Sequence, residues 1–439
     1  MIRKVLLSLI MLLLAMLLAT CGGTEAQQPY YDATTIFTSG RARAEYLEDL
    51  SHLYNTLVAN WPFVGVIYRT MGVDMHQLYI EARAHFETVD DIRSDNEFAI
   101  ILNRLFIQPF SRHGHFDMLR SDFLRMHIEA FNNAVVAGDD WVANFLSEIN
   151  NPATRALHGL TDEDFALPDM DNGGLSLVYA TTPNNVQTRI IEYGRIAYVN
   201  ILHMNSATME LDRITLLDFF HHVANYEHLI IDIRQNGGGI SEFFPNLVMS
   251  PNISQPLETY FYMFTMDGDH NQHLMALHFG DWRSNGVSNS AFSPIHGDLL
   301  NHLVYLNPFD AELLDLYYIW HGGIDPIYDE AIFGGRIWLL ISEWNFSVAE
   351  QAAFFSKQTG FATLVGQTTR GDGLGFQPLV LALPNTGIVV RYSSIYGTDP
   401  LGRNNQEFGT DPHYFNRPNM DALQTVLAMI EESMIEYHD

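Results

Sequence analysis

The sequence predicts a mixed α/β core that follows a helical N-terminal domain. Residues 196–202, 229–233 and 337–341 are nearly continuous apolar runs of strand length, as strands buried on both faces are. Between the first two runs, one face of a predicted helix carries Leu216, Leu217, Phe220, Val223 and Ala224. Strand, helix and strand at this spacing form a crossover unit. We therefore expect parallel pairing at the centre of the sheet.

The segment before this core has helical periodicity. Its clearest stripe has the spacing i, i+4, i+7 and i+11 and consists of Tyr46, Leu50, Leu53 and Leu57. The helix should end before Trp61-Pro62, because proline disfavours helical backbone in the residue before it. Further helical patterns cover residues 75–86, 92–105 and 123–149, the last with a break at Gly138-Asp139. We expect a helical domain over 38–152, preceded by a polar tether over 22–37.

The core is expected to extend over 175–439. Later strands are predicted at 362–365, 379–383 and 388–392, the last two joined as a hairpin by Pro384-Asn385-Thr386-Gly387. A terminal helix is indicated by a stripe of Leu423, Val426, Leu427, Ile430 and Met434. Residues 251–335 are aromatic and weakly periodic, which suggests an insertion that forms a cap over a cleft.

Charge excludes one class of partner. The 439 residues contain 23 Lys and Arg against 52 Asp and Glu, a formal net charge of -29. Such a surface repels a phosphate backbone, so nucleic-acid binding is not expected. Lysine occurs only as Lys4 and Lys357, which restricts the choice of catalytic base.

The N-terminus has the pattern of an export signal. A short basic segment precedes the apolar run 5–19, and the only cysteine, Cys21, follows that run. Leu18-Ala19-Thr20-Cys21 resembles a bacterial lipobox, with Thr20 a departure from the small residue usual there. We expect residues 1–20 to be removed and Cys21 to be lipidated, which places the protein in the cell envelope, at the periplasmic or cell-surface side of a membrane. The alternative is an uncleaved anchor with an incidental cysteine.

Two strand ends could carry chemistry. Asp232-Ile-Arg234-Gln-Asn236 is followed by Gly237, Gly238 and Gly239, and such a turn can present amides to an oxyanion or serve only as a flexible turn. The run 337–341 leads through Asn345 and Phe346 to Ser347 at the start of a helix, where amides and the helix dipole favour negative charge. The alternative is a capping box formed by Ser347 and Glu350.

A third segment, His113-Gly114-His115-Phe116-Asp117, follows a helical pattern. Its His-x-His-x-Asp spacing also occurs at metal sites, but Met118 stands where a further histidine would be needed, and neither H-E-x-x-H nor a cysteine pair is present. We expect neither a metal nor an organic cofactor.

In combination, these segments resemble the tail-specific, or C-terminal processing, serine peptidases. The resemblance covers about 190–435. It rests on Asp232-x-Arg234-x-Asn236-Gly-Gly, on Ser347 followed by Ala349-Glu350, on Val365-Gly366-x-x-Thr369, on the 384–387 hairpin and on the tail Glu407 to Pro412. It implies a ClpP/crotonase-like core, a peptide or protein substrate and Ser347 as the nucleophile.

The family's branches differ in their base. One branch has a lysine in the Gly-x-Gly turn that here reads Gly371-Asp372-Gly373. Lys357 lies ten residues after Ser347 on the same predicted helix, about 15 Å along its axis, so a Ser–Lys pair is excluded. The tricorn-like branch uses a histidine, which His115 matches, with His113 as its close rival. That branch adds a tail carboxylate, for which Glu407 is nearest, although Gln406 occupies the family's position.

The resulting interpretation is an exported, membrane-anchored serine peptidase. Ser347 attacks the substrate carbonyl, His115 acts as general base, Glu407 supports the site, and the Gly237–Gly238 turn with the Val348 amide binds the oxyanion. The alternative is a non-catalytic peptide- or lipid-binding lipoprotein on the same fold. An α/β-hydrolase is disfavoured because no G-x-S-x-G motif occurs.

Overall fold

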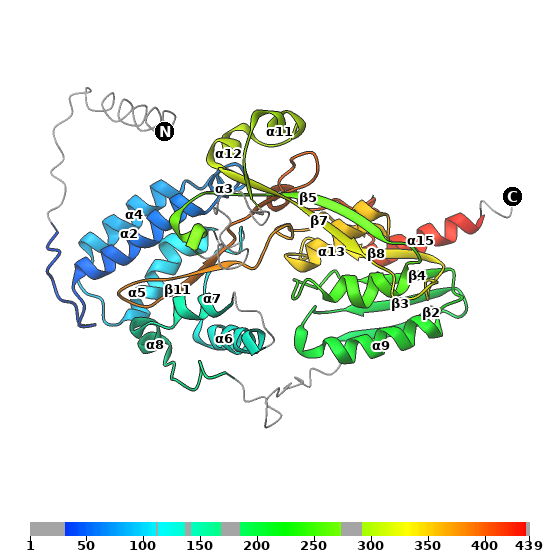
Figure 1. Ribbon diagram of the computed structural model, residues 1–439, viewed down its shortest axis with the longest axis horizontal. Helices are drawn as coiled ribbons and strands as arrows, with labels where there is room; N and C mark the ends of the chain where they lie inside the picture. The colour runs from blue at the N-terminus through cyan, green and yellow to red at the C-terminus, as the bar shows by residue number, and fades with distance from the viewer. Residues whose placement is uncertain (1–30, 111–112, 137–141, 168–184, 274–291, 436–439) are drawn as a thin grey trace.

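The computed structural model describes residues 31–110, 113–136, 142–167, 185–273 and 292–435. They form two lobes, an N-terminal lobe of helices and a sheet lobe (Figure 1). The predicted signal segment, Cys21, most of the tether and the break at Gly138-Asp139 lie outside the described residues. Among the residues that the structure describes, no helix combines the length and apolar character needed to cross a membrane.

The sheet lobe is built on a six-stranded sheet in the order β13-β9-β8-β4-β3-β2. The four central strands are parallel, which confirms the crossover prediction, and β2 pairs antiparallel at one edge. β13 pairs parallel at the other edge. The strands are β2 Val186–Glu192, β3 Ile196–Ile201, β4 His228–Asp232, β8 Arg336–Ile341, β9 Thr363–Gly366 and β13 Tyr414–Phe415.

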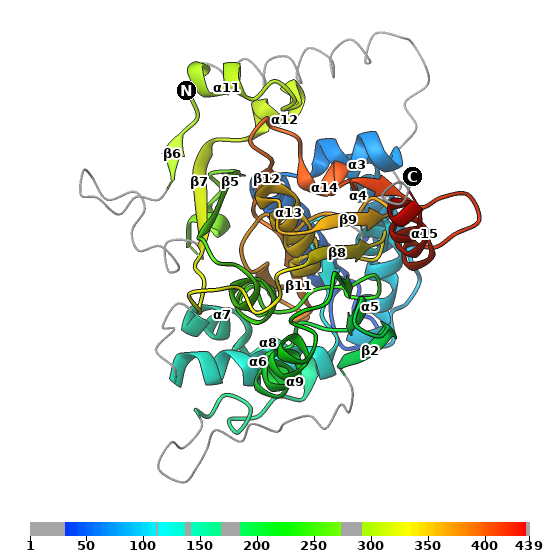
Figure 2. The same ribbon diagram turned by 90° about the vertical axis from the view of Figure 1, so that its right-hand side faces the viewer.

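Helices cover both faces of this sheet. α9 (Met209–His222) and α13 (Val348–Thr359) pack on one face, against side chains such as Leu229, Ile231 and Leu339. α15 (Ala422–Ile435) packs on the other face against Ile230, Trp338 and Leu340. Figure 2 shows α13 and α15 on opposite sides of β8 and β9. Because the central strands β4 and β8 are buried on both faces, their sequences are nearly continuous apolar runs instead of alternating ones.

The N-terminal lobe begins with α2 (Arg43–Asn60), and all four residues of its predicted stripe are fully buried. As expected, the helix ends before Pro62, with Trp61 as its C-cap. The other helices of this lobe are α3 Val64–Met71, α4 Met75–Thr88, α5 Asp95–Leu102, α6 Ser121–Val136, α7 Val142–Ile149 and α8 Pro152–His158. A π-helical turn (Asn103–Ile107) and a 3-10 turn (Gln108–Phe110) continue α5.

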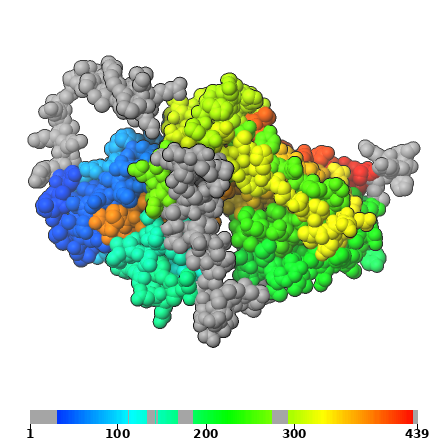
Figure 3. All heavy atoms as spheres, in the orientation of Figure 1, coloured from blue at the N-terminus to red at the C-terminus, as the bar shows by residue number. Residues whose placement is uncertain are grey.

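The predicted hairpin forms, but in the N-terminal lobe. β10 (Leu379–Ala382) and β11 (Val389–Tyr392) form a three-stranded sheet with β1 (Asp117–Met118), and their side chains join the core of the helical lobe. In Figure 3 the orange hairpin lies between the blue and cyan helices. A domain boundary at 152 or 175 is therefore too simple, because the core of the helical lobe includes residues from beyond 379.

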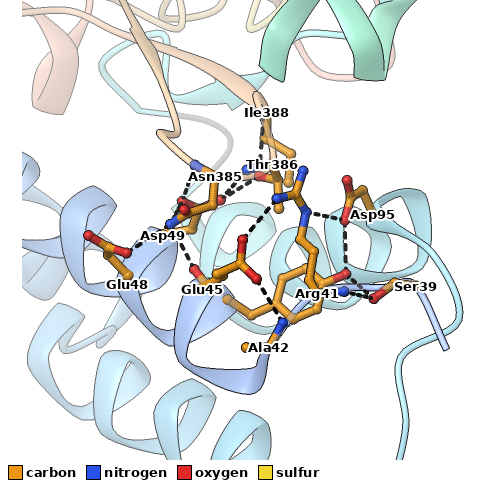
Figure 4. Close-up of polar contacts among 11 residues, drawn as sticks. Ser39, Arg41, Ala42, Glu45, Glu48, Asp49, Asp95, Asn385, Thr386 and Ile388 are labelled. Carbon is orange, nitrogen blue, oxygen red and sulfur yellow. Dashed lines mark hydrogen bonds and ion pairs between the residues drawn. The ribbon is translucent and has the colours of Figure 1, made fainter. Parts of the chain in front are cut away.

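The hairpin tip is held by one buried carboxylate. Asp49 of α2 is fully buried and accepts hydrogen bonds from the amides of Asn385 and Thr386 at 2.9 and 2.8 Å and from the Thr386 hydroxyl at 2.5 Å (Figure 4). Burial raises the pKa of Asp49, and these donors oppose that shift. Gly387 lies against the backbone of Ala153, where a Cβ would come within 2.2 Å of its carbonyl carbon. The tip thus lies between α2 and α8.

The predicted insertion is part of the fold's core. Its two long strands, β5 (Leu257–Thr265) and β7 (Leu316–Ile324), pair with each other, and β5 also pairs with β12 (Tyr396–Thr398). Phe261 and Met263 of β5 are buried with the α13 side of the main sheet. The expectation of a separate cap over 251–335 is therefore wrong for these strands, since their side chains complete the core.

Short elements complete the described fold. They are the 3-10 turn Ser206–Thr208, the π turn Pro245–Met249, the 3-10 turn Ser250–Asn252, β6 Ser293–Pro294, α11 Gly297–His302, α12 Pro308–Leu313 and α14 Asn405–Phe408.

Candidate active site

Ser347 lies where β8 gives way to α13. Its backbone is in the left-handed region, with φ +56°, and its amide donates to the Gly371 carbonyl at 3.2 Å. Its hydroxyl makes no capping hydrogen bond to the helix, so the capping-box alternative is not realised. A serine held in strained backbone at a strand-to-helix turn is typical of an exposed nucleophile and unusual for a cap, which prefers extended φ and ψ.

Glu350, the other half of the expected capping box, points elsewhere. Its carboxylate is fully buried and accepts from the Asn405 side-chain amide and the Thr410 hydroxyl, both at 2.6 Å. Burial raises the pKa of Glu350 to about 7, although these donors oppose the shift. Glu350 therefore joins the first turn of α13 to the start of α14 and to the segment that follows it.

The glycine turn after β4 lies against Ser347. A Cβ on Gly238 would come within 3.1 Å of the Ser347 Cβ and 3.0 Å of the Val348 nitrogen. The side chain of Asn345 joins the two turns, donating to the carbonyls of Ile233 and Asn236 at 2.5 and 3.0 Å. The structure thus brings Gly238 and the Val348 amide together beside the serine and leaves Gly237 with open space at its Cβ position.

One part of the oxyanion expectation needs correction. The Gly238 amide donates to the Asn236 side-chain oxygen at 2.8 Å, so this N–H is already engaged within its own turn. Gly238 has no side chain, which lets the glycine turn lie directly against the Ser347 turn. The Val348 amide is at the first residue of α13, where helix amides have no intrahelical acceptor, so this amide can still donate to a bound oxygen.

His115 reaches the site from the N-terminal lobe. Its ring packs against that of Phe346, the residue before Ser347, with ring centroids 4.5 Å apart. The loop that carries it leads into β1, and β11 holds β1 through the pairs Asp117–Arg391 and Met118–Val390. His113, the rival base, lies instead beside Thr70 of α3, with its Nε2 3.2 Å from the threonine hydroxyl.

The side chains of the His-x-His-x-Asp segment have three different partners. Asp117 accepts two hydrogen bonds from Arg391, each of 2.8 Å, while His113 and His115 face Thr70 and Asp372. Within the described ranges, no group of three or more His, Cys, Asp or Glu side chains is arranged to hold a metal ion.

Asp372 is the site residue that the sequence reasoning missed. Its Oδ2 lies 2.5 Å from Nδ1 of His115, and both side chains are about nine-tenths buried. It occupies the middle of the Gly371-Asp372-Gly373 turn, with φ +58°, where the other branch has its lysine. Gly373 lies against the backbone after Ser347, where its Cβ would come within 2.5 Å of the Ser347 carbonyl oxygen. The one sequence feature that could have indicated this role is the acidic side chain of Asp372 in the Gly-x-Gly turn.

Glu407 and Lys357 have other partners. Both oxygens of Glu407 accept from Arg69, at 3.0 and 2.6 Å, and Arg69 also pairs with the buried Asp310. The expectation that Glu407 supports His115 therefore needs correction, since the carboxylate that contacts His115 is that of Asp372. Lys357 donates to the Asp411 carbonyl at 2.7 Å, and burial lowers its pKa. This partner is consistent with the exclusion of a Ser–Lys pair.

Backbone strain is concentrated at these residues. Of the four non-glycine residues with positive φ in the described part of the chain, three are His115, Ser347 and Asp372. Such conformations cost of order 1–3 kcal/mol each and persist where the surrounding structure enforces them, most often at functional sites. A nucleophile, an imidazole and an orienting carboxylate held in this way can carry out acyl transfer.

Comparison with known proteins identifies the family. The model of peptidase family S41 matches residues 195–415, about half of the chain. The chain belongs to peptidase family S41. Its membership makes it a serine-type peptidase, with a protein or peptide as substrate. No curated relative matches the chain.

Solved structures share the fold of this S41 chain at low identity. A Parabacteroides merdae protein assigned as a peptidase has a TM-score of 0.50 and 16% identity, covering 88% of this chain and 96% of its own. A mutant of CPAF has a TM-score of 0.50 and 15% identity, with coverages of 85% and 93%. Mature CPAF complexed with lactacystin has a TM-score of 0.49 and 14% identity, with coverages of 85% and 94%.

The close approach of the glycine turn to Ser347 depends on the absence of a side chain at Gly238. We expect Gly238→Ala to reduce labelling of Ser347 by a fluorophosphonate probe at least a hundredfold, because the new methyl group meets the Ser347 turn and φ is +115°. Gly237→Ala is the matched control, since its Cβ position is open, and it should label within a fewfold of the parent. Equal labelling of both variants would contradict the geometry of the turn.

Proposed function

We propose that this S41 peptidase hydrolyses peptide bonds through an acyl-enzyme on Ser347, with His115 as general base and Asp372 as the orienting acid. The observation that carries the proposal is the placement of His115, which packs against Phe346 and pairs with Asp372 through Nδ1. Because a carboxylate can only accept, Nδ1 carries the proton in this contact. Nε2 is then free to accept the serine proton.

The reaction follows from these roles. Ser347 Oγ attacks the substrate carbonyl while its proton passes to His115 Nε2, and Asp372 stabilises the resulting imidazolium. The Val348 amide, at the N-terminus of α13, donates to the developing oxyanion. His115 then donates its proton to the leaving amine. A water molecule, deprotonated by His115, hydrolyses the acyl-enzyme and restores Ser347.

A non-catalytic binding protein is the weaker alternative. Such a protein has no need for a serine, a histidine and an aspartate that are all held at positive φ. Nor does a binding role require a largely buried imidazole to be paired with a carboxylate beside a serine turn. Both features are costly, and both serve proton transfer.

The base is tested by comparing two nearby histidines. We expect His115→Ala to lower the rate of fluorophosphonate labelling of Ser347 by two to four orders of magnitude, because the serine loses its proton acceptor. His113→Ala should stay within a few-fold of the parent, since His113 faces Thr70. The measurement is the adduct mass against time, with Ser347→Ala as the unlabelled control.

Two outcomes would contradict the assignment. Full labelling of His115→Ala would leave the base to another residue. Absence of labelling in the parent, with probe-reactive serine peptidases as positive controls, would favour the binding protein.

We propose separately that the protein is exported and attached to a membrane by a lipid on Cys21. The support is the position of Cys21, the only cysteine, directly after the apolar run 5–19. Two acyl chains attach a protein stably to a membrane, whereas a single chain gives only marginal membrane binding. Mass spectrometry of the membrane fraction should find a mature N-terminus at Cys21 that carries acyl chains. An unmodified Cys21 peptide, or a start elsewhere, would refute the anchor.

A further inference from the structure

Ser393 touches both members of the His115–Asp372 pair. It follows β11 directly and is 5% exposed. Its Oγ lies 3.1 Å from His115 Nδ1 and 3.3 Å from Asp372 Oδ2. No local sequence pattern marks Ser393, because its neighbours in space are 278 and 21 residues away along the chain.

The role of Ser393 follows from which atoms around Asp372 carry protons. Asp372 Oδ2 accepts from His115 Nδ1 at 2.5 Å, so the one Nδ1 proton is used in that bond. The Ser393 hydroxyl has one proton as well, and Asp372 Oδ2 is its acceptor. Two donors thus converge on a single carboxylate oxygen, an arrangement that fixes the rotamer of Asp372.

The backbone of Ser393 is tied to the same loop. Its amide donates to the Gly114 carbonyl at 2.5 Å, directly beside His115. The Gly114 amide in turn donates to the side chain of Gln406 at 2.9 Å. The serine hydroxyl is therefore held at a set position relative to the imidazole, and it can fix Asp372 against that ring without moving the loop.

We propose that Ser393 is a positioning residue, which holds the Asp372 carboxylate in line with His115 Nδ1. The proposal rests on the proposed function, in which His115 is the base. Ser393 is assigned no contact with the reacting atoms, and it acts through the hydrogen bond that it donates to Asp372. In a variant that lacks the Ser393 hydroxyl, Asp372 accepts one hydrogen bond fewer and can turn away from the imidazole. The His115 tautomer with its proton on Nδ1 is then less populated.

The test is a double-mutant cycle on the full-length chain. We expect Ser393→Ala to lower the rate of fluorophosphonate labelling of Ser347 about tenfold, the size of one hydrogen bond to a charged group. In an Asp372→Asn background the same change should cost less than twofold, because the group that Ser393 positions is already lost. Ser393→Thr, which keeps the hydroxyl, should recover most of the rate.

Two controls separate positioning from folding. Ser356→Ala removes another fully buried serine hydroxyl, which has no hydrogen-bond partner among the described residues, and it should leave the rate unchanged. Thermal unfolding of each variant reports loss of fold. A tenfold loss that is the same in both Asp372 backgrounds would overturn the proposal, as would an unchanged rate in Ser393→Ala. Failure of the parent itself to label would contradict the proposed function instead.

Discussion

The hydrogen bond between His115 and Asp372 is the contact on which the site depends. It joins residues 257 positions apart, one from the N-terminal lobe and one from the turn beside the nucleophile. Neither lobe contains a complete site, because Ser347 belongs to the sheet lobe while His115 belongs to the loop before β1. The lobes must therefore be held in register to within the length of one hydrogen bond.

The β10–β11 hairpin supplies that register. It leaves the sheet lobe, crosses into the N-terminal lobe and pairs with β1, so one element contacts both sides of the site. Its tip is fixed on α2 by the buried carboxylate of Asp49 (Figure 4). At its other end, the Ser393 amide is bound to Gly114. Burying Asp49 is costly unless its hydrogen bonds are complete, which makes the docked position strongly favoured.

The elements of the fold could be predicted from the sequence where an apolar pattern extends over many residues. The α2 stripe, the parallel central strands and the strand-to-helix position of Ser347 all follow from periodicity and spacing. The pairing of the hairpin could not be predicted, since its partner β1 has only two residues and shows no alternation. The strands β5 and β7 could not be predicted at their full length, because their mixed aromatic and polar sequences show no regular alternation.

The acid of the site was missed for a different reason. Asp372 is defined by contact with a residue far away in sequence, and the local sequence shows only that the turn has no lysine. In the short helix α14, a difference of one sequence position decides whether a side chain faces the His115 loop. Neighbouring helical residues point about 100° apart, so Gln406 faces the His115 loop while Glu407 faces Arg69.

The most direct test is the labelling rate of Ser347 in Asp372→Asn. An asparagine of the same shape can donate to Nδ1, which favours the tautomer whose Nε2 already carries a proton. We predict a fall of about three to four orders of magnitude with the fold retained. Asp421→Asn, at a surface ion pair with Arg234, should match the parent. A parental rate in Asp372→Asn would contradict the account of this site.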